Sequence, residues 1–259
     1  MQLIVLGSGS TVPHPKRTSS LYWVKTSGGS ILLDCPASAP SRMAAEALDW
    51  PELDAMWISH FHMDHCGGLG PLLAGMKHAS EMKEREKPLT IFGPKGIKEL
   101  VDRVSDVNNY RLLEQPFPVE IIEIDTLQPF SILRGVEATA MKTPHTAESH
   151  AIHIRDAENT TLVFSADTAF TEDIATLARG VDLFILECTF FKNKPTHKHL
   201  GLEEAMYLIR KAKPKRAMLT HFYPEWDEVD FEAEIGKFSP GCDVIEAVDG
   251  LRLGFRNSE

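Results

Sequence analysis

Five short apolar segments of this sequence each end at, or within three residues of, an aspartate or a histidine. The segments are rich in β-branched, leucine and aromatic residues, which is typical of buried strands. Residues that follow strands lie on loops, where catalytic and binding groups are concentrated. The five residues are Asp34, His60, His145, Asp167 and His221. The pattern predicts sheets with one edge that carries histidine and aspartate side chains.

Predicted strands and helices follow one another in an order that repeats twice, with no long linker and no low-complexity tract. The predicted strands cover residues 2–7, 21–26, 30–35, 54–59, 89–93, 119–124, 130–135, 136–142, 150–155, 161–167, 182–188 and 216–220, followed by a terminal pair. The predicted helices cover residues 40–48, 67–84, 95–106, 171–179, 201–213 and 227–237. Two mixed sheets with helices outside both would bury these strands. We therefore expect an α+β fold, a four-layer αββα sandwich, as one domain over residues 1–259.

The bulk composition narrows the function. With 259 residues, 43% of them hydrophobic, the chain is long enough to bury a large core. Its 27 lysines and arginines against 37 aspartates and glutamates give a net charge of −10. General nucleic-acid binders present a basic face, so this acidity argues against that class. Bound metal ions would still let one cleft attract a phosphate, because they reverse the local field.

The cysteines and the amino-terminal segment bear on the cellular compartment of the protein. Cys35, Cys66, Cys188 and Cys242 form no CxxC pair, which argues against a zinc ribbon and a thioredoxin-like site. The start MQLIVLGSGS lacks the pattern of a signal peptide. No apolar run reaches the roughly 18 residues of a membrane span. We expect a cytoplasmic protein without a membrane partner.

The segment HFHMDH, which directly follows the predicted strand at residues 54–59, is the strongest functional signal. In extended backbone, His60 and His62 point to the same side and can bind one ion together. Asp64 and His65 point elsewhere and can bind a second ion, and two such ions clamp a hydrolytic water and a phosphoryl or acyl oxygen. A single histidine after a strand is usually a surface residue. Four ligand-type residues at this spacing favour a metal site.

HFHMDH matches the HxHxDH signature of the metallo-β-lactamase superfamily, and the sequence resembles that superfamily over nearly its whole length. The resemblance implies two divalent ions, with zinc expected first and manganese or iron as alternatives. It assigns His60, His62 and His145 to one ion, Asp64, His65 and His221 to the other, and Asp167 to both. Asp34 resembles the residue that orients a ligand histidine. A water held between the ions would attack the substrate.

Within that superfamily, the chain is most similar to the RNase Z branch. The loop LGSGSTVPHPKRTSSL, the segment ECTFF and the segment HLGLEEA resemble three of its motifs. The resemblance places His199 near the scissile phosphate as a general acid, with Glu187 orienting it. Lys16 and Arg17 are predicted phosphate contacts, although two exposed charges are more often simply solvated. Asp64, His199 and Glu187 are thus the predicted catalytic residues.

Two features depart from RNase Z. The long arm that grips tRNA is missing at its usual place, because only 21 residues separate His145 from Asp167. The acidic run EWDEVDFEAE, after His221, would repel a polyanion if it faced the cleft. The related cyclic phosphodiesterases of phosphonate breakdown share HxHMDH, but they carry a cysteine-rich zinc site that this chain lacks.

The predicted function is that of a dinuclear metal-dependent hydrolase, a phosphodiesterase resembling RNase Z. Its predicted substrate is a small molecule or RNA, and with RNA the protein would act as a 3′-end endonuclease. By resemblance we also expect a homodimer. One alternative is a carboxylic ester, lactone or thioester hydrolase on the same site, which would not need His199. Another is a non-catalytic, metal-bound interaction protein, but such proteins usually have degraded ligand sets.

Overall fold

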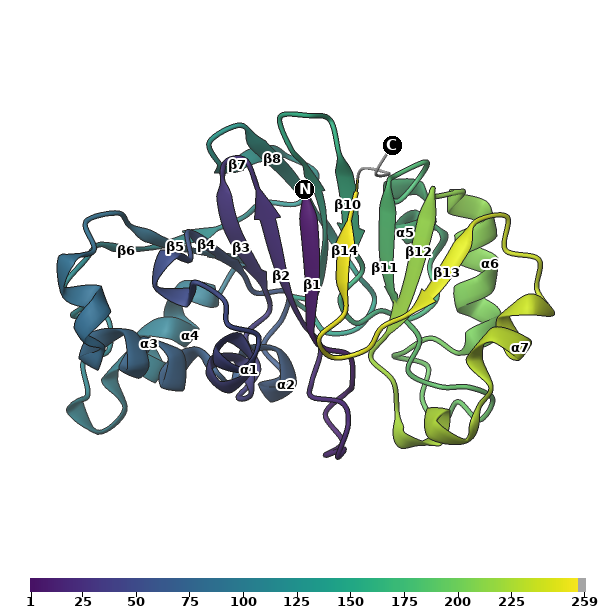
Figure 1. Ribbon diagram of the computed structural model, residues 1–259, viewed down its shortest axis with the longest axis horizontal. Coiled ribbons are helices and arrows are strands. Elements are labelled where there is room, and N and C mark those ends of the chain that lie inside the picture. Colours follow the sequence, from purple (N-terminus) through teal and green to yellow (C-terminus); the bar gives the residue numbers. More distant parts are fainter. Residues whose placement is uncertain (256–259) are drawn as a thin grey trace.

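The computed structural model describes residues 1–255, which form two seven-stranded mixed sheets (Figure 1). The first sheet has the order β14 (Arg252–Gly254), β1 (Gln2–Gly7), β2 (Leu21–Thr26), β3 (Gly29–Leu33), β4 (Ala55–Trp57), β5 (Leu89–Gly93) and β6 (Val119–Glu123). The second has the order β13 (Asp243–Glu246), β12 (Arg216–Thr220), β11 (Leu183–Glu187), β10 (Thr161–Phe164), β9 (His150–Arg155), β8 (Val136–Lys142) and β7 (Pro129–Leu133). The prediction of two mixed sheets is confirmed.

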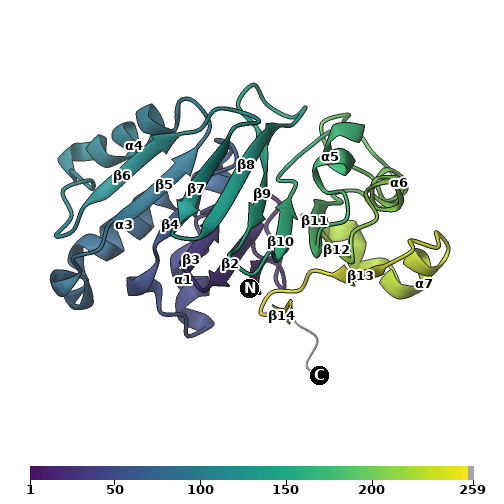
Figure 2. The same ribbon diagram turned by 90° about the horizontal axis from the view of Figure 1, so that it is seen from above.

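Helices cover the outer face of each sheet (Figures 1 and 2). The first sheet is covered by α1 (Ala39–Ala45), α2 (Met63–Cys66), α3 (Leu69–His78) and α4 (Ile97–Asp106). The second is covered by α5 (Glu172–Leu177), α6 (Leu202–Ala212) and α7 (Phe231–Gly236). Four 3₁₀ turns complete the described elements: η1 (Trp50–Glu52), η2 (Ser80–Glu84), η3 (Val107–Asn109) and η4 (Pro224–Glu228). The αββα sandwich is therefore confirmed.

Burial on both faces explains why β1 is apolar from Leu3 to Leu6. Leu3 and Val5 face the second sheet and belong to the core between the sheets. Ile4 and Leu6 point to the opposite face, into a separate core beneath α1 and α3. A strand covered on both faces loses the apolar–polar alternation of a surface strand. This double burial is why the sequence shows continuous apolar runs.

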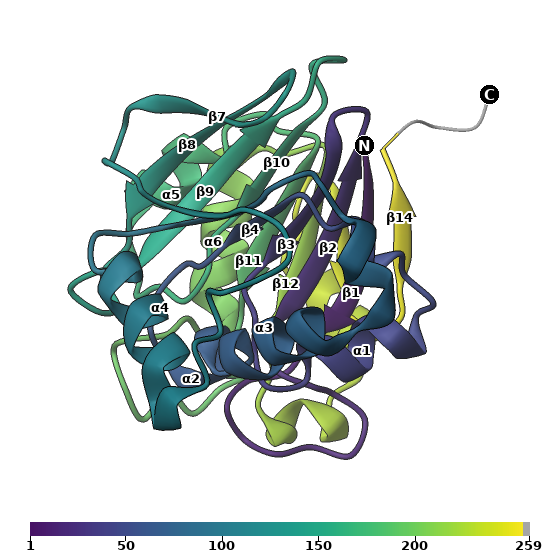
Figure 3. The ribbon, with the colours of Figure 1, turned by 90° about the vertical axis from the view of Figure 1, so that its left-hand side faces the viewer.

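The strand directions gather the functional loops at one edge of the sandwich. In the first sheet β3, β4, β5 and β6 are mutually parallel, and in the second β10, β11, β12 and β13 are. Parallel neighbours end at the same edge, so the loops after these strands emerge together. Figure 3 shows this edge from the side of the first sheet.

Two predicted helices are shorter than expected. The segment 67–84 is helical only to His78, because Ala79 takes an extended conformation before η2 begins. The segment 227–237 is divided into η4 and α7, since Asp230 caps a new helix by accepting a hydrogen bond from the Ala233 amide at 3.0 Å. Aspartate favours this role because its side chain satisfies an otherwise unpaired amide.

Two further findings bear on the composition. All four cysteines lie among the described residues and are unpaired, three of them buried and Cys242 half-buried. Within residues 1–255, no helix combines the length and apolar character required to cross a bilayer.

Candidate metal centre

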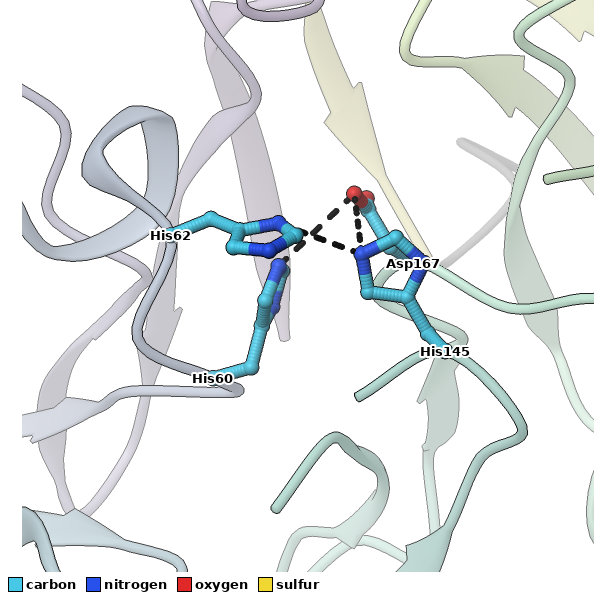
Figure 4. A group of neighbouring side chains, drawn as sticks. All are labelled: His60, His62, His145 and Asp167. Atoms are coloured by element: carbon cyan, nitrogen blue, oxygen red, sulfur yellow. Dashed lines mark hydrogen bonds and ion pairs between the residues drawn. The ribbon is translucent and has the colours of Figure 1, made fainter. Parts of the chain in front are cut away.

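The seven residues predicted to bind metal lie together at the edge where the strands of both sheets end. His60, His62, Asp64 and His65 lie on the loop after β4 and on α2, at the first sheet. His145, Asp167 and His221 follow β8, β10 and β12 of the second sheet. Figure 4 shows His60 and His62 pointing across the gap toward His145 and Asp167. The tertiary structure therefore joins residues that are up to 161 positions apart in the sequence.

The first cluster consists of His60, His62, His145 and Asp167, and its potential ligand atoms all lie within 4.8 Å of one another. The His145 Nε2 atom is 3.2 Å from the His62 Nδ1 atom. The Asp167 Oδ2 atom is 3.5 Å from His145 Nε2 and 3.7 Å from His60 Nε2. These separations suit side chains that converge on one ion.

The second cluster consists of Asp64, His65 and His221. The Asp64 Oδ2 atom is 3.7 Å from His65 Nε2 and 3.6 Å from His221 Nε2. The other oxygen of Asp167, Oδ1, lies 3.3 Å from His65 Nε2 and 3.4 Å from His221 Nε2. Asp167 thus presents one carboxylate oxygen to each cluster, which is the arrangement a bridging ligand needs.

Hydrogen bonds on the far side of the imidazole rings hold two histidines of the first sheet. The Asp34 Oδ2 atom accepts a hydrogen bond from His65 Nδ1 at 2.7 Å. The Ser59 Oγ atom lies 3.0 Å from His60 Nδ1 and donates to Asp34 at 2.9 Å. Sequence reasoning singled out Asp34 but missed Ser59, because a serine at a strand end is too common to carry a signal.

A second network, centred on Glu187, holds His199 and His221 on the side of the other sheet. The Thr189 hydroxyl lies 2.8 Å from His221 Nδ1 and 2.7 Å from Glu187 Oε2. Glu187 Oε1 lies 3.0 Å from His199 Nδ1 and accepts a hydrogen bond from the amide of Thr168, next to Asp167. Sequence reasoning also missed Thr189, although it lies in ECTFF, because spacing alone does not tell which polar side chain reaches a ligand.

Burial and neighbouring charges set the protonation of the cluster. Burial lowers the pKa of His60 to about 2, so this imidazole is neutral and its nitrogen is available as a ligand. Burial favours the neutral acid of Asp167, but the charges of His221 and His65 hold its pKa well below the usual range. Burial also opposes the charged form of His199, yet Glu187 outweighs it and raises the His199 pKa to about 8.

The backbone at three of these positions is in the left-handed region. The φ angles are 62° at Asp34, 50° at Ala166 and 63° at His221. Non-glycine residues rarely take this conformation, and it is concentrated at functional sites. Asp34 and His221 are themselves residues of the site, and Ala166 directly precedes Asp167, so each left-handed residue turns the chain at a strand end where a site residue is placed.

A pocket of about 400 Å³ opens over the two clusters. Its lining comprises Thr11, His62, Met63, Asp64, Asp167, His199, His221 and Tyr223. Of the two aromatic residues that follow His221, Tyr223 lines the pocket, whereas Phe222 is buried in the core and packs on Trp226. Met63, which also lines this pocket, is 69% exposed.

The two predicted phosphate contacts of the first loop differ in their surroundings. Lys16 is exposed at the surface. Arg17 forms an ion pair with Asp227 of η4, lies 3.6 Å from Glu246, and stacks over the Phe222 ring. Arg17 is therefore engaged with two carboxylates at the rim of the site, and no contact joins either cation to the two clusters within residues 1–255.

The residues present fit a pair of metal ions. Within the described chain, the Nε2 atoms of His60, His65 and His221 are buried without a hydrogen bond, although Asp167 lies 3.3 to 3.7 Å from them. Unbonded buried nitrogens are costly unless another partner satisfies them. Each of the three rings has its Nδ1 atom fixed by Ser59, Asp34 or Thr189, which leaves Nε2 as the free ligand atom.

Comparison with known proteins places this site in a family. Residues 1–239 match the model of the family described as anti-Pycsar protein Apyc1. Ribonuclease Z of Methanocaldococcus jannaschii is 30% identical in an alignment 287 residues long. The alignment covers 89% of this chain and 88% of that protein. Ribonuclease Z of Agathobacter rectalis is 24% identical in an alignment 281 residues long, which covers 89% of this chain and 90% of that protein.

Solved structures share the fold along the whole chain. The metallo-β-lactamase fold protein YhfI of Bacillus subtilis has a TM-score of 0.81 at 22% identity, covering 98% of this chain and 99% of that chain. The short form of human tRNase Z has a TM-score of 0.78 at 19% identity, covering 99% and 100%. A diphosphatase of the PhnP family has a TM-score of 0.73 at 19% identity, covering 98% of each chain.

These matches confirm the predicted superfamily and the predicted class of metal-dependent hydrolase. The family model covers most of the chain, and one ribonuclease Z reaches 30% identity over most of its own length. The protein therefore belongs to the family of anti-Pycsar protein Apyc1, in the RNase Z-like branch of the metallo-β-lactamase superfamily.

Proposed function

We propose that this protein is a phosphodiesterase that uses two divalent metal ions and acts on small diesters. The observation that carries the proposal is the convergence of three unbonded imidazole nitrogens and two carboxylates beside His199. Histidine and aspartate ligands, rather than cysteine, are typical of hydrolytic metal sites. The relatives named ribonuclease Z and the diphosphatase of the PhnP family support a phosphorus-centred reaction.

One ion would be held by His60, His62 and His145, and the other by Asp64, His65 and His221, with Asp167 contributing one oxygen to each. When bound, the ions would supply Lewis acidity and a water nucleophilic at neutral pH. We expect zinc, since imidazole and carboxylate ligands suit it, and manganese or iron would be the alternatives.

His199 would protonate the oxygen of the leaving group. Its Nδ1 atom is held by Glu187, which leaves Nε2 as the atom that donates into the pocket. Glu187 itself is buried and is held by the amides of Thr168 and Leu200, so it fixes the imidazole ring in one orientation. A general acid in this position lowers the barrier for poor leaving groups in particular.

Small diesters fit the surroundings of the site better than RNA. Between His145 and Asp167 the structure has only β9, β10 and their turns, so no arm extends from that part of the chain. Arg17, a predicted phosphate contact, forms an ion pair with Asp227 of the acidic η4 turn, and this pairing opposes a role in binding a polyanion. The net charge of −10 opposes long-range attraction of a nucleic acid. We therefore propose small diesters as substrates, and the substrate test below decides between them and RNA 3′-end cleavage.

We propose one domain over the chain and a homodimer, the latter by analogy with the RNase Z branch. We also propose a reducing, cytoplasmic environment, because the four cysteines are unpaired. The carboxylic ester, lactone or thioester alternative gains no support from the relatives, whose names point to ribonucleases, a diphosphatase and metallo-hydrolases.

The test compares two leaving groups with the zinc- or manganese-loaded protein and its His199→Ala variant. One substrate is bis(4-nitrophenyl) phosphate, and the other is a dinucleoside monophosphate, which must release a basic alkoxide. General acid catalysis contributes roughly 10²- to 10⁴-fold, so His199→Ala should lower turnover of the dinucleotide by that factor. Nitrophenolate leaves without a proton, so its release should fall far less.

His197→Ala is the matched control, because His197 is an exposed histidine on the same loop and should leave both rates unchanged. Equal losses on both substrates would rule out the acid role of His199. No turnover of either diester by fully loaded protein would rule out the phosphodiesterase. Faster cleavage of a tRNA precursor than of the dinucleotide would reject the preference for small substrates.

A further inference from the structure

A second cavity, of about 590 Å³, lies beside the metal pocket between α3 and α4. We define the α3–α4 groove by its walls, which include Gly70 and Ala74 on α3, Leu100 and Val104 on α4, and Tyr110 after η3. None of the residues that line it is a lysine, arginine, aspartate or glutamate, and His78 is its one titratable nitrogen side chain. Its volume lies within the roughly 300–1,000 Å³ of small-molecule sites.

The groove adjoins the metal pocket through Met63. This side chain lines both cavities and is the N-terminal residue of α2, directly before the predicted ligand Asp64. Met63 is 69% exposed, and Val107 and Tyr110, which also line the groove, are exposed apolar residues as well; a contiguous apolar surface of this kind is typical of a binding groove. A ligand whose phosphate sits at the metal centre would therefore have its next apolar group within reach of the groove.

The segment after α4 contributes to the wall of the groove and contains left-handed backbone. Asn108, Asn109 and Arg111 in this segment have φ angles of 51°, 58° and 50°, in the left-handed region. Val107 and Tyr110 are 58% and 61% exposed, and both line the groove. Lys77 of α3 holds the segment by donating to the carbonyl oxygens of Tyr110 and Arg111 at 3.1 and 2.7 Å.

We infer that the α3–α4 groove binds an aromatic substituent of the phosphodiester substrate, with Met63 and Tyr110 as its contacts. The groove offers apolar surface, a thioether and a phenol ring, and these groups favour a neutral, planar ligand. It offers no formal charge to a second phosphate. The metal pocket takes the anionic centre of the ester, and the uncharged groove takes one of its organic groups. This inference rests on the proposed phosphodiesterase function.

Two esters with the same leaving group separate the groove from the chemistry. Phenyl 4-nitrophenyl phosphate and methyl 4-nitrophenyl phosphate are both monoanionic and both release nitrophenolate. Burial of the phenyl group should favour the phenyl ester by about tenfold or more in kcat/KM, mainly through KM. Ala74→Phe fills the groove with a ring, and Tyr110→Ala removes one wall. Both variants should lose most of this preference while the methyl ester is hydrolysed within about twofold of the wild-type rate.

Gly75→Phe is the matched control, since Gly75 is the next residue on α3, is exposed, does not line the groove and has nothing within 4 Å of an added Cβ atom. It should keep the phenyl preference. Val248→Ser tests the loss of another exposed apolar side chain, at 52% exposure and outside the groove, and should also have no effect. Thermal unfolding of each variant separates loss of the groove from loss of the fold.

The outcomes distinguish the two hypotheses. If the methyl ester turns over but Ala74→Phe keeps the wild-type preference, the groove assignment is wrong and the phosphodiesterase stands. If neither ester turns over, the proposed function fails, and calorimetric binding of diphenyl against dimethyl phosphate then decides the groove by the same tenfold criterion. If the wild type sediments as a dimer that Tyr110→Ala and Ala74→Phe dissociate, with the ester preference unchanged, a second copy occupies the groove and the inference is overturned.

Discussion

The two sides of the metal centre are built in different ways. On the first sheet, His60, His62, Asp64 and His65 come from six consecutive residues after one strand. On the second sheet, each residue comes from its own strand end, and residues of other loops hold it in place. A compact loop can be read as a motif, whereas a set of scattered ligands depends on the register and direction of several strands.

The two sides also differ in how their histidines are held. His65 is held by the carboxylate of Asp34 at 2.7 Å, and His221 is held by the neutral hydroxyl of Thr189 at 2.8 Å. Hydrogen bonds to an ionised partner are roughly twice as strong as neutral ones. The comparison therefore predicts that the first-sheet side depends more on one charge, and the second-sheet side more on a network.

The largest effect is expected from Asp167→Asn, because one carboxylate oxygen of Asp167 faces His60 and the other faces His65. Outer residues of metal sites typically contribute about 10- to 100-fold, so loss of this ligand should lower activity by more than about 100-fold. Elemental analysis should show less than two ions per chain. Asp125→Asn, at an exposed position, is the control and should retain full metal content.

Asp34→Asn should have the next largest effect. The asparagine keeps the shape and tolerates the left-handed backbone at φ 62°, so the fold should survive. It loses the charge that orients His65, and metal affinity should fall by roughly 10- to 100-fold. Metal titration against a chelating dye measures this. An unchanged affinity would mean that Ser59, the other contact of Asp34, holds the loop by itself.

Thr189→Val should weaken the second-sheet side by a smaller factor. Valine keeps the branched shape but removes the hydroxyl that joins His221 to Glu187. We expect a loss of activity of about tenfold, at the lower end of effects seen for outer residues. Thr176→Val, which removes an exposed hydroxyl on α5, is the control. Activity and metal affinity are measured for both variants, and a larger fall of either quantity in Thr189→Val than in Asp34→Asn would reverse the proposed difference between the two sides.

The smallest effect is expected from Tyr22→Phe, which tests the packing between the sheets rather than the site. The buried Tyr22 hydroxyl is hydrogen-bonded to Thr220, at the end of β12, and its ring packs on Phe164 at 5.3 Å between centroids. Loss of one buried hydrogen bond should cost about 0.5–1.5 kcal/mol of unfolding free energy. Denaturant unfolding measures this cost. Activity at 25 °C should stay within twofold, and a larger fall would indicate that the hydroxyl positions His221.

Much of the fold was predictable from the sequence because burial leaves a direct trace in it. The strands β1, β2 and β3 were correctly placed from apolar runs such as QLIVLG, since strand positions that are covered on both faces are mostly apolar. The ends of helices were less predictable. The acidic segment at 227–237 has a helical pattern, but the cap formed by Asp230 divides it.

The sequence by itself determined the first-sheet side of the candidate site and the set of residue types on the other side. The four ligand-type residues of HFHMDH lie within six positions, so their relative placement depends on local backbone conformation and not on the rest of the chain. Only the tertiary structure decided that Thr189 reaches His221, that Arg17 pairs with Asp227, and that the α3–α4 groove adjoins the metal pocket at Met63. These contacts join segments that are 32 to 210 residues apart or depend on how two helices pack, and such distances are fixed by sheet register and core packing rather than by any local pattern.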